Sequence, residues 1–126
     1  MGQRYLIDSN AASDFLDGLL PPKGRNLLNK AEPFISIITQ IEVFSYKELS
    51  VDNKRKLTVF VENATVFEVD ELVALKTINL RLNYKIKLAD AIIAATALHY
   101  HLTLITHNTS DFKKIKGLKL IDPYNI

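Results

Sequence analysis

Short apolar runs that alternate with longer helical patterns are the feature that most restricts the fold of this chain. The expected strands cover residues 5–7, 33–37, 65–69 and 102–105, with a short fifth strand at 119–121. These runs are largely apolar and do not alternate regularly between apolar and polar residues, which is typical of strands that are buried on both faces of a sheet. The pattern therefore predicts a three-layer α/β/α fold with a mostly parallel central sheet of four to five strands.

The segments between the expected strands carry apolar residues at helical spacing. The expected helices cover residues 11–20, 25–30, 39–49, 52–62, 71–83 and 88–100, and the first is expected to stop at Pro21 and Pro22. Residues 88–100 are apolar nearly all round, which predicts a helix packed on several sides. Since 126 residues contain no repeat and no long linker, residues 1–126 are expected to form a single domain.

Composition narrows the class of protein further. Apolar residues make up 48% and charged residues 24% of the chain, values close to those of ordinary globular domains. The absence of cysteine excludes disulfides and thiolate metal sites. The start of the chain lacks a signal-peptide pattern, and the longest apolar stretch, 91–105, is too short to span a bilayer. A cytoplasmic protein with no membrane association is expected.

The net charge of +2 conceals a strongly basic region near the C-terminal end. Residues 81–119 contain seven basic and two acidic residues, a local charge of +5 by subtraction. A polyanionic partner such as RNA would suit this region, and a solvated lysine-rich surface is the alternative. The candidates for phosphate contacts are Lys85, Lys87, Lys113, Lys114 and Lys116.

Four acidic residues stand within apolar segments or soon after them: Asp8, Glu42, Asp90 and Asp111. Burying an isolated carboxylate costs several kcal/mol unless a partner charge compensates. Parallel sheets bind ligands at the carboxyl ends of their strands, and all four residues can face that edge. Convergence on one cation is therefore predicted. Oxygen ligands without cysteine or paired histidine favour Mg²⁺ or Mn²⁺.

Ordinary helix capping is the alternative interpretation of the first two acidic residues. Asp8 is followed by Ser9 and Asn10, and all three residue types are favoured N-caps. Thr39 and Glu42 have the spacing of a capping box, in which the glutamate would reach back to the Thr39 amide. Either feature could exist without any ligand.

The other two acidic residues have alternatives of the same kind. Asp90 could be stabilised by the positive end of the helix that it begins, an effect of up to ~1 kcal/mol at an exposed site. That effect does not explain a charge among Leu88, Ala89 and Ala91. Asp111 could instead cap a short turn that runs through Lys113.

Four motifs follow one another in a fixed order along the chain. The first is an apolar residue followed by Asp8-Ser9-Asn10, and the second is residues 35–42, which end in Thr39-x-x-Glu42. The third is the alanine-rich segment 88–97 around Asp90, and the fourth is residues 104–112, Leu-Ile-Thr-x-Asn-x-x-Asp-Phe. With these motifs the chain resembles the PIN domain family, specifically small VapC-type toxin ribonucleases, from residue 6 to about residue 122.

The resemblance implies a metal-dependent endoribonuclease that leaves a 5′-phosphate and a 3′-hydroxyl. It implies that the metal ligands are Asp8, Glu42, Asp90 and Asp111. It also implies that water or carboxylates are oriented by Ser9, Asn10, Thr106 and Asn108. The expected partners are an RNA substrate, a protein antitoxin of a type II toxin–antitoxin pair and a second copy of the chain. The alternative is a catalytically inactive PIN-like module that binds RNA or protein.

Overall fold

The computed structural model describes residues 3–126 of the chain. These residues form the strands β1 (Tyr5–Ile7), β2 (Phe34–Ser36), β3 (Thr65–Phe67), β4 (Thr103–Ile105) and β5 (Leu120–Ile121). The helices are α1 (Ser9–Leu16), α2 (Pro22–Lys30), α3 (Ile37–Phe44), α4 (Val51–Glu62), α5 (Glu71–Asn83), α6 (Leu88–His99) and α7 (Thr109–Phe112). The strands form one sheet in the order β3-β2-β1-β4-β5, and every neighbouring pair is parallel.

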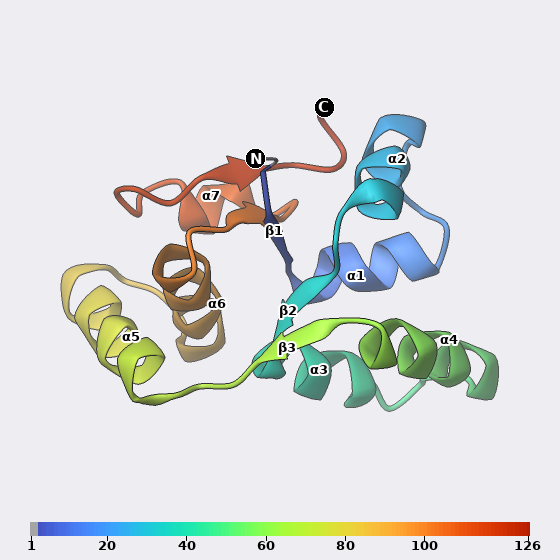
Figure 1. The fold of residues 1–126 in the computed structure, drawn as a ribbon, viewed down its shortest axis with the longest axis horizontal. Coiled ribbons are helices and arrows are strands. Elements are labelled where there is room, and N and C mark those ends of the chain that lie inside the picture. The colour runs from blue at the N-terminus through green and yellow to red at the C-terminus, as the bar shows by residue number, and fades with distance from the viewer. Residues whose placement is uncertain (1–2) are drawn as a thin grey trace.

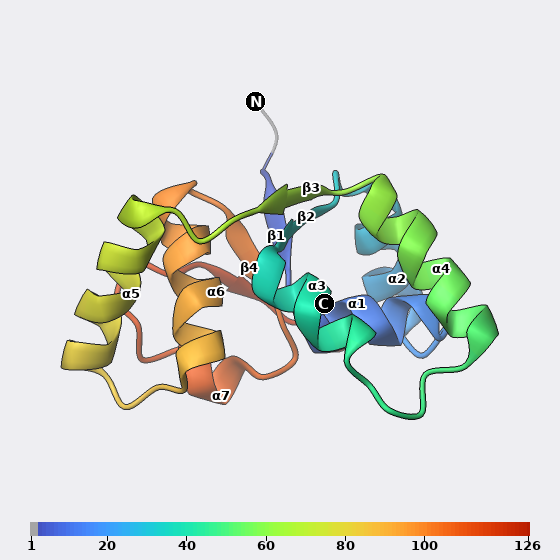
Figure 2. The ribbon, with the colours of Figure 1, turned by 90° about the horizontal axis from the view of Figure 1, so that it is seen from below.

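Helices cover both faces of the sheet, which confirms the predicted three-layer architecture (Figure 1). Figure 2 shows α5 and α6 on one side of the sheet and α1, α2 and α4 on the other. Leu6 and Leu104 belong to the core beside α5 and α6, whereas Ile7 and Ile105 belong to the core beside α1 and α2. Because successive strand residues face opposite sides, burial of both faces produces the continuous apolar runs.

The carboxyl ends of β1, β4 and β5 lie side by side at one edge of the sheet. Ile7 is level with Ile105, and Ile105 is level with Ile121. The three strands are each followed directly by a polar residue, namely Asp8, Thr106 and Asp122. Since β2 is parallel to β1, its carboxyl end points the same way, and α3 begins directly after it. This edge is where an open parallel sheet binds its ligands.

The first two helices differ from the sequence prediction at their boundaries. α1 was expected over 11–20 but runs from Ser9 to Leu16, because Asp17 forms its C-cap and Gly18 then takes a left-handed conformation with φ of 71°. Glycine adopts this conformation without steric cost, and it commonly ends helices. α2 begins at Pro22, not at residue 25, since proline is well suited to the first helical position.

The third helix also begins and ends earlier than predicted. α3 was expected over 39–49 but covers Ile37–Phe44, and its N-cap is Ser36, whose side chain accepts a hydrogen bond from the Ile38 amide at 3.1 Å. The last helix, α7, forms where only a turn was expected. α4, α5 and α6 lie within one residue of their predicted ranges, and the strands are at most two residues shorter than predicted.

No helix within residues 3–126 combines the length and the apolar character that crossing a bilayer would require. The C-terminal segment instead packs tightly against α2. Gly24 of α2 is buried, and a Cβ atom at this position would lie 2.0 Å from the carbonyl oxygen of Pro123. That distance is far below van der Waals contact, so helix and backbone meet only because residue 24 has no side chain.

Gly24→Ala is therefore expected to lower the free energy of unfolding by about 1–3 kcal/mol, the usual cost of overpacking. Helix propensity alone would favour alanine by about 1 kcal/mol, so the sign of the change tests the close packing. Thermal unfolding of the variant measures it, with the exposed Asn29→Ala of the same helix as the control. A melting temperature at or above that of the wild type would contradict the prediction.

Candidate active site

A cavity of about 320 Å³ opens at the carboxyl edge of the sheet. It is bounded by the N-terminal turns of α1 and α6, the end of α3, and the start of the segment after β4. Its lining includes the predicted site residues Asp8, Ser9, Asn10, Glu42, Asp90 and Asn108. Ser45, Tyr46, Ile93 and Phe112 complete the lining. Ile93 and Phe112 lie within the third and fourth motifs, whereas Ser45 and Tyr46 lie outside all four motifs. The topology thus brings four separate segments together.

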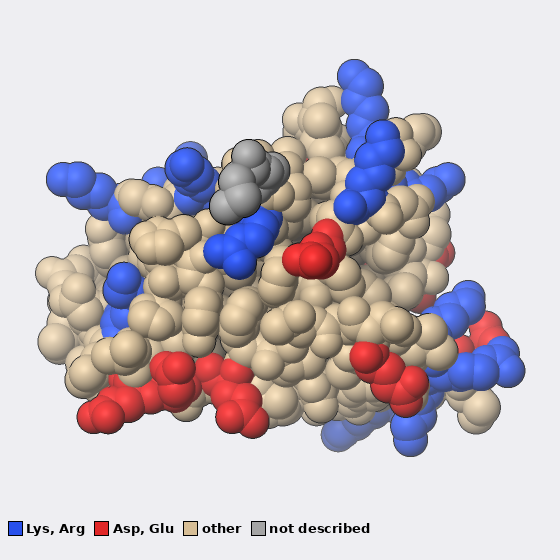
Figure 3. Space-filling model, in the orientation of Figure 1, with Lys and Arg blue, Asp and Glu red and all other residues tan. Residues whose placement is uncertain are grey.

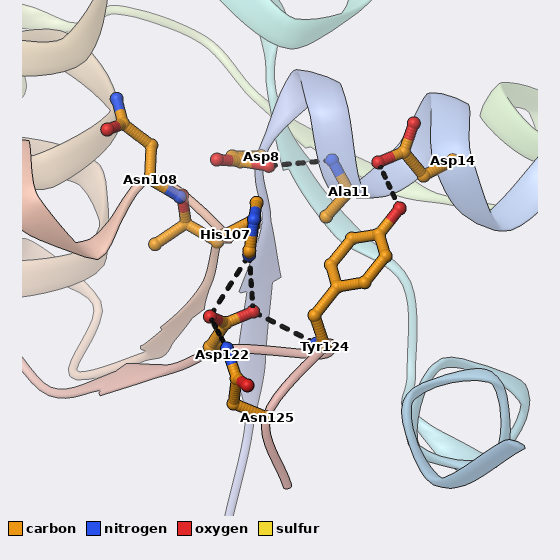
Figure 4. A network of polar contacts seen from close by, with 9 residues as sticks. Asp8, Ala11, Asp14, His107, Asn108, Asp122, Tyr124 and Asn125 are labelled. Atoms are coloured by element: carbon orange, nitrogen blue, oxygen red, sulfur yellow. Dashed lines mark hydrogen bonds and ion pairs between the residues drawn. The ribbon is translucent and has the colours of Figure 1, made fainter. Parts of the chain in front are cut away.

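Asp8 is the most buried of the predicted acidic residues, with 6% of its surface exposed. It is the N-cap of α1, and its Oδ1 atom accepts a hydrogen bond from the Ala11 amide at 2.8 Å (Figure 4). Burial raises the pKa of Asp8 to about 6, and the charges of Asp90 and Glu42 act in the same direction. The Thr106 hydroxyl and the Ala11 amide oppose this shift. Asp8 therefore caps α1 and also has a carboxyl group whose pKa is raised.

Glu42 does not form the capping box that its spacing with Thr39 allowed. Ser36 caps α3, and Thr39 lies inside the helix. Glu42 instead accepts a hydrogen bond from the Ser9 hydroxyl, with 2.5 Å between Ser9 Oγ and Glu42 Oε1. This contact joins the end of β1 to α3 and turns the glutamate toward the cavity that Asp8 lines. The capping interpretation of Glu42 was wrong.

Asp90 lies half-buried in the first turn of α6. Burial raises its pKa, the charges of Asp111 and Glu42 raise it further, and Lys87 opposes them. Asp111 is exposed, lies within α7, and accepts a hydrogen bond from Asn108 Nδ2 at 2.8 Å. Asp111 is therefore not a cap, since α7 begins after Asn108. Its carboxylate is oriented by the amide that the sequence motif places three residues earlier.

The charges of the four carboxylates act on one another. Asp90 and Glu42 raise the pKa of Asp8. Asp111 and Glu42 raise the pKa of Asp90. The four carboxylates are not equally buried, however. Glu42 and Asp111 are exposed, so the expected desolvation cost applies to Asp8 and in part to Asp90. Within residues 3–126, no group of three or more carboxylate or imidazole side chains is arranged to hold a metal ion. A shared cation therefore stays a prediction.

A second cavity, of about 500 Å³, adjoins the first, because Asp90 lines both. Its cationic residues are Arg81, Lys85, Lys87 and Lys114, and Asp111 is also in its lining. Three of the five predicted phosphate-contact lysines thus lie here. The other two, Lys113 and Lys116, are exposed but do not line this cavity.

Arg81 is a residue that the sequence motifs missed. It lies in the last turn of α5, and only its membership of the basic region 81–119 pointed to it. Lys114 is held in place, since its ammonium group donates a hydrogen bond to the Lys85 carbonyl oxygen. An acidic cavity beside a cationic one can bind a metal ion and a phosphate group next to each other.

Comparisons with known proteins agree with this fold. The PIN domain family model matches residues 5–118. A toxin–antitoxin complex from Klebsiella pneumoniae contains a chain that is 32% identical, with a TM-score of 0.80, over 97% of this chain and 99% of that one. DNA-bound VapBC from Salmonella typhimurium is 24% identical, with a TM-score of 0.80, over 97% of this chain and 99% of that one.

VapBC2 from Rickettsia felis, bound to a promoter DNA fragment, is 23% identical, with a TM-score of 0.79, over 95% of this chain and 98% of that one. At these two lower identities the likeness shows the fold. No curated protein matches the sequence. The family model covers most of the chain, and the architecture agrees with it throughout. This chain belongs to the PIN domain family.

Proposed function

We propose that this chain is a Mg²⁺- or Mn²⁺-dependent endoribonuclease and the toxin of a type II toxin–antitoxin pair. One observation carries the proposal: four carboxylates from four separate segments are coupled electrostatically at the sheet edge, directly beside a cationic cavity. Membership of the PIN domain family and the 32% identity to a chain of a toxin–antitoxin complex support it. A cytoplasmic location is part of the same proposal.

The donor chemistry of the site fits a divalent cation. The acidic groups are all carboxylates, which suit Mg²⁺ and Mn²⁺. The pKa values of Asp8 and Asp90 are raised mainly by burial and further by like charges nearby. We assign the cation to Asp8, Glu42, Asp90 and Asp111. When bound, such an ion supplies positive charge to the phosphodiester and lowers the pKa of a water molecule.

The neighbouring polar residues have roles that follow from their contacts. Ser9 donates a hydrogen bond to Glu42, and Asn108 donates one to Asp111. The Thr106 hydroxyl accepts a hydrogen bond from the backbone amide of Asn108 at 3.0 Å and lies beside Asp8. Each contact limits the rotation of a carboxylate that would otherwise turn away from its like-charged neighbours. Asn10 is exposed in the cavity lining and is available to the substrate or to a water molecule.

Incubating the purified chain with structured RNAs, with and without Mg²⁺ or Mn²⁺, tests the function. The expected result is endonucleolytic cleavage that requires the divalent ion and stops when EDTA is added. Products with a 5′-phosphate and a 3′-hydroxyl are expected. RNA binding without cleavage in either metal would favour the alternative, a catalytically inactive PIN-like binding module.

The cationic cavity is proposed to bind RNA phosphates. We expect RNA affinity, measured on an uncleavable Asp90→Asn protein, to fall steeply between low and moderate salt, because bound phosphates release counterions. Replacing Lys87 or Arg81 with glutamine should reduce the slope of log affinity against log salt concentration by about 1, the contribution of one phosphate contact. Lys23→Gln, in the exposed part of α2, is the control. An RNA affinity that does not change with salt concentration would show that the cationic cavity does not bind RNA phosphates.

The antitoxin is proposed to cover a third cavity, of about 450 Å³, beside the acidic one. Leu16, Leu49 and Leu57 line it together with Tyr46, which also borders the acidic cavity. Tyr46 is 49% exposed, so its surface is accessible to a partner. A small DNA-binding reading frame directly upstream of this gene would favour the toxin over a housekeeping nuclease.

A homodimer is proposed through the outer face of α5. Four large apolar side chains on this helix are more than half exposed: Leu72, Leu75, Ile78 and Leu82. Figure 3 shows acidic side chains gathered over the start of α5, where the exposed acidic residues are Glu68, Asp70 and Glu71. The other end of the helix carries Arg81 and leads to Lys85. Antiparallel pairing of two copies would bring opposite charges together around the apolar stripe.

Leu75→Glu should therefore convert a dimer into a monomer, because it places a charge in the centre of the stripe. The mass in solution, measured by sedimentation or light scattering, shows the change. Val59→Glu is the control, since Val59 is exposed to a similar extent, 54% against 55% for Leu75, but lies on α4. A wild-type monomer at micromolar concentration would exclude this interface.

A further inference from the structure

His107 is fixed more firmly than an exposed histidine requires. Its Nδ1 atom lies 3.0 and 3.1 Å from the two carboxylate oxygens of Asp122 (Figure 4). The same carboxylate accepts hydrogen bonds from the Tyr124 amide at 2.9 Å and from Asn125 Nδ2 at 2.7 Å. Burial alone would raise the pKa of Asp122, but these donors and His107 outweigh it and hold the pKa below its ordinary value.

A second set of contacts fixes the plane of the imidazole. The Tyr124 ring lies 4.6 Å from the His107 ring, between centroids, and the Tyr124 hydroxyl donates a hydrogen bond to Asp14 Oδ2 at 2.7 Å. Asp14 belongs to α1, so residues from two other parts of the chain, α1 and the C-terminal segment, orient one side chain. That side chain is still 59% exposed. Exposed ion pairs usually add at most about 1 kcal/mol to stability, which is a weak reason for such an arrangement.

Among residues 3–126, the hydrogen bonds of the His107 ring involve Nδ1 alone and leave the second ring nitrogen, Nε2, without a partner. An ionised Asp122 requires the proton on Nδ1, so Nε2 is the atom available to another molecule. We assign this tautomer from the hydrogen-bond partners. Nε2 can accept a hydrogen bond from a hydroxyl when the ring is neutral, or donate one to a phosphate oxygen when the ring is protonated.

His107 is also well placed relative to the candidate active site. It stands between Thr106, which borders Asp8, and Asn108, which lines the acidic cavity. Its ring contact with Tyr124, whose hydroxyl bonds to Asp14 of α1, puts it on the α1 side of the sheet. The cationic cavity is formed by residues of α5, α6, α7 and the segments beside them, on the other side. A nucleic-acid strand that crosses the edge would meet lysines on one side and His107 on the other.

We propose that His107, oriented by Asp122, is a substrate-positioning residue that contacts the RNA sugar–phosphate backbone through Nε2. The inference rests on the proposed ribonuclease function and adds a residue that stands at an unspecified position of the fourth motif. Its two possible contacts, a phosphate oxygen or a ribose 2′-hydroxyl, belong to the same backbone and can be separated by experiment.

Two amide substitutions separate the functions of the two ring nitrogens. His107→Asn keeps an N–H group near the position of Nδ1, so it retains the bond to Asp122 but has nothing at Nε2. His107→Gln places its amide near Nε2 and gives up the Nδ1 contact. In the uncleavable Asp90→Asn background with Mg²⁺ present, we expect His107→Asn to weaken RNA binding about tenfold, the loss of one good contact. His107→Gln should recover most of that affinity.

The control is His101→Asn, at an exposed histidine near the opposite end of β4, whose φ of 57° suits asparagine. It should bind RNA like the background protein. Melting temperatures of the three variants report any damage to the fold. In the active protein, His107→Asn should raise KM for RNA while the melting temperature stays unchanged.

RNA and DNA strands of the same sequence identify the contact. Weaker binding of both strands supports the proposal with a phosphate contact, and weaker binding of RNA alone supports it with a 2′-hydroxyl contact. His107→Asn that binds as tightly as the background, or His107→Gln that is the weaker of the two, overturns the proposal and leaves only a structural role. If wild type neither binds nor cleaves RNA, the proposed function fails together with the inference.

Discussion

Asp90→Asn is expected to reduce the rate of RNA cleavage by at least about 100-fold, because it removes a charge worth a few kcal/mol of transition-state stabilisation. Asp90 is the one carboxylate that lines both the acidic and the cationic cavity. Its position in the first turn of α6 tolerates asparagine, and the substitution changes no volume. Single-turnover cleavage of a labelled RNA with saturating Mg²⁺ measures the effect.

Asp17→Asn is the matched control, since Asp17 is an exposed C-cap residue of α1 where asparagine is well tolerated. It should cleave at the wild-type rate. RNA binding by Asp90→Asn should remain, because the basic side chains of the cationic cavity are unchanged. Cleavage by Asp90→Asn within a factor of a few of wild type would mean that the acidic cavity is not the reaction site.

The layers and the parallel sheet followed directly from the apolar pattern. Largely apolar runs at residues 5–7 and 103–105 are typical of a sheet covered on both faces, and the α6 segment is apolar nearly all round because neighbours pack on several sides of it. Burial of this kind leaves a strong signal in sequence. The edge at which Asp8 would lie then followed from parallel topology alone.

Helix ends and exposure depend on local contacts that no periodicity encodes. The capping box of Thr39 and Glu42 was plausible by spacing, yet Ser36 caps α3 because the strand ends directly before it. Four carboxylates next to apolar runs suggested four buried charges, but Glu42 and Asp111 face solvent. A residue beside an apolar run can lie on the opposite face of its helix, and only packing decides which face is covered.

Residues that are far apart in the sequence and meet only in the folded site do not form a recognisable sequence motif. Arg81 reaches the cationic cavity because α5 packs against α6, and its own neighbours in sequence are ordinary helix residues. Asp122 orients His107 because β5 adds to the sheet beside β4. Such pairs, fifteen or more residues apart, become visible only when the sheet order is known.

In protein freed of divalent ions, the free energy of unfolding is expected to fall by up to about 3 kcal/mol as the pH rises from about 4 to about 6. The cause is Asp8, whose pKa is raised by burial to about 6 in the folded chain from its ordinary value of 3.8. Between these values the folded state binds the proton more tightly than the unfolded state does, so raising the pH favours unfolding. Asp8→Asn removes this titration and keeps the N-cap, because asparagine caps as well as aspartate.

A divalent ion should reverse the effect, since its charge compensates the ionised carboxylates that destabilise the metal-free fold at neutral pH. Millimolar Mg²⁺ or Mn²⁺ at pH 7.5 is expected to raise the melting temperature of the wild type, by mass action on the folded state. In Asp8→Asn the metal-dependent rise should be much smaller, and the metal-free protein should melt above the metal-free wild type. Asp17→Asn should behave like the wild type. A wild-type melting temperature that stays the same in Mg²⁺ and in Mn²⁺ up to several millimolar would mean that these carboxylates do not share a cation.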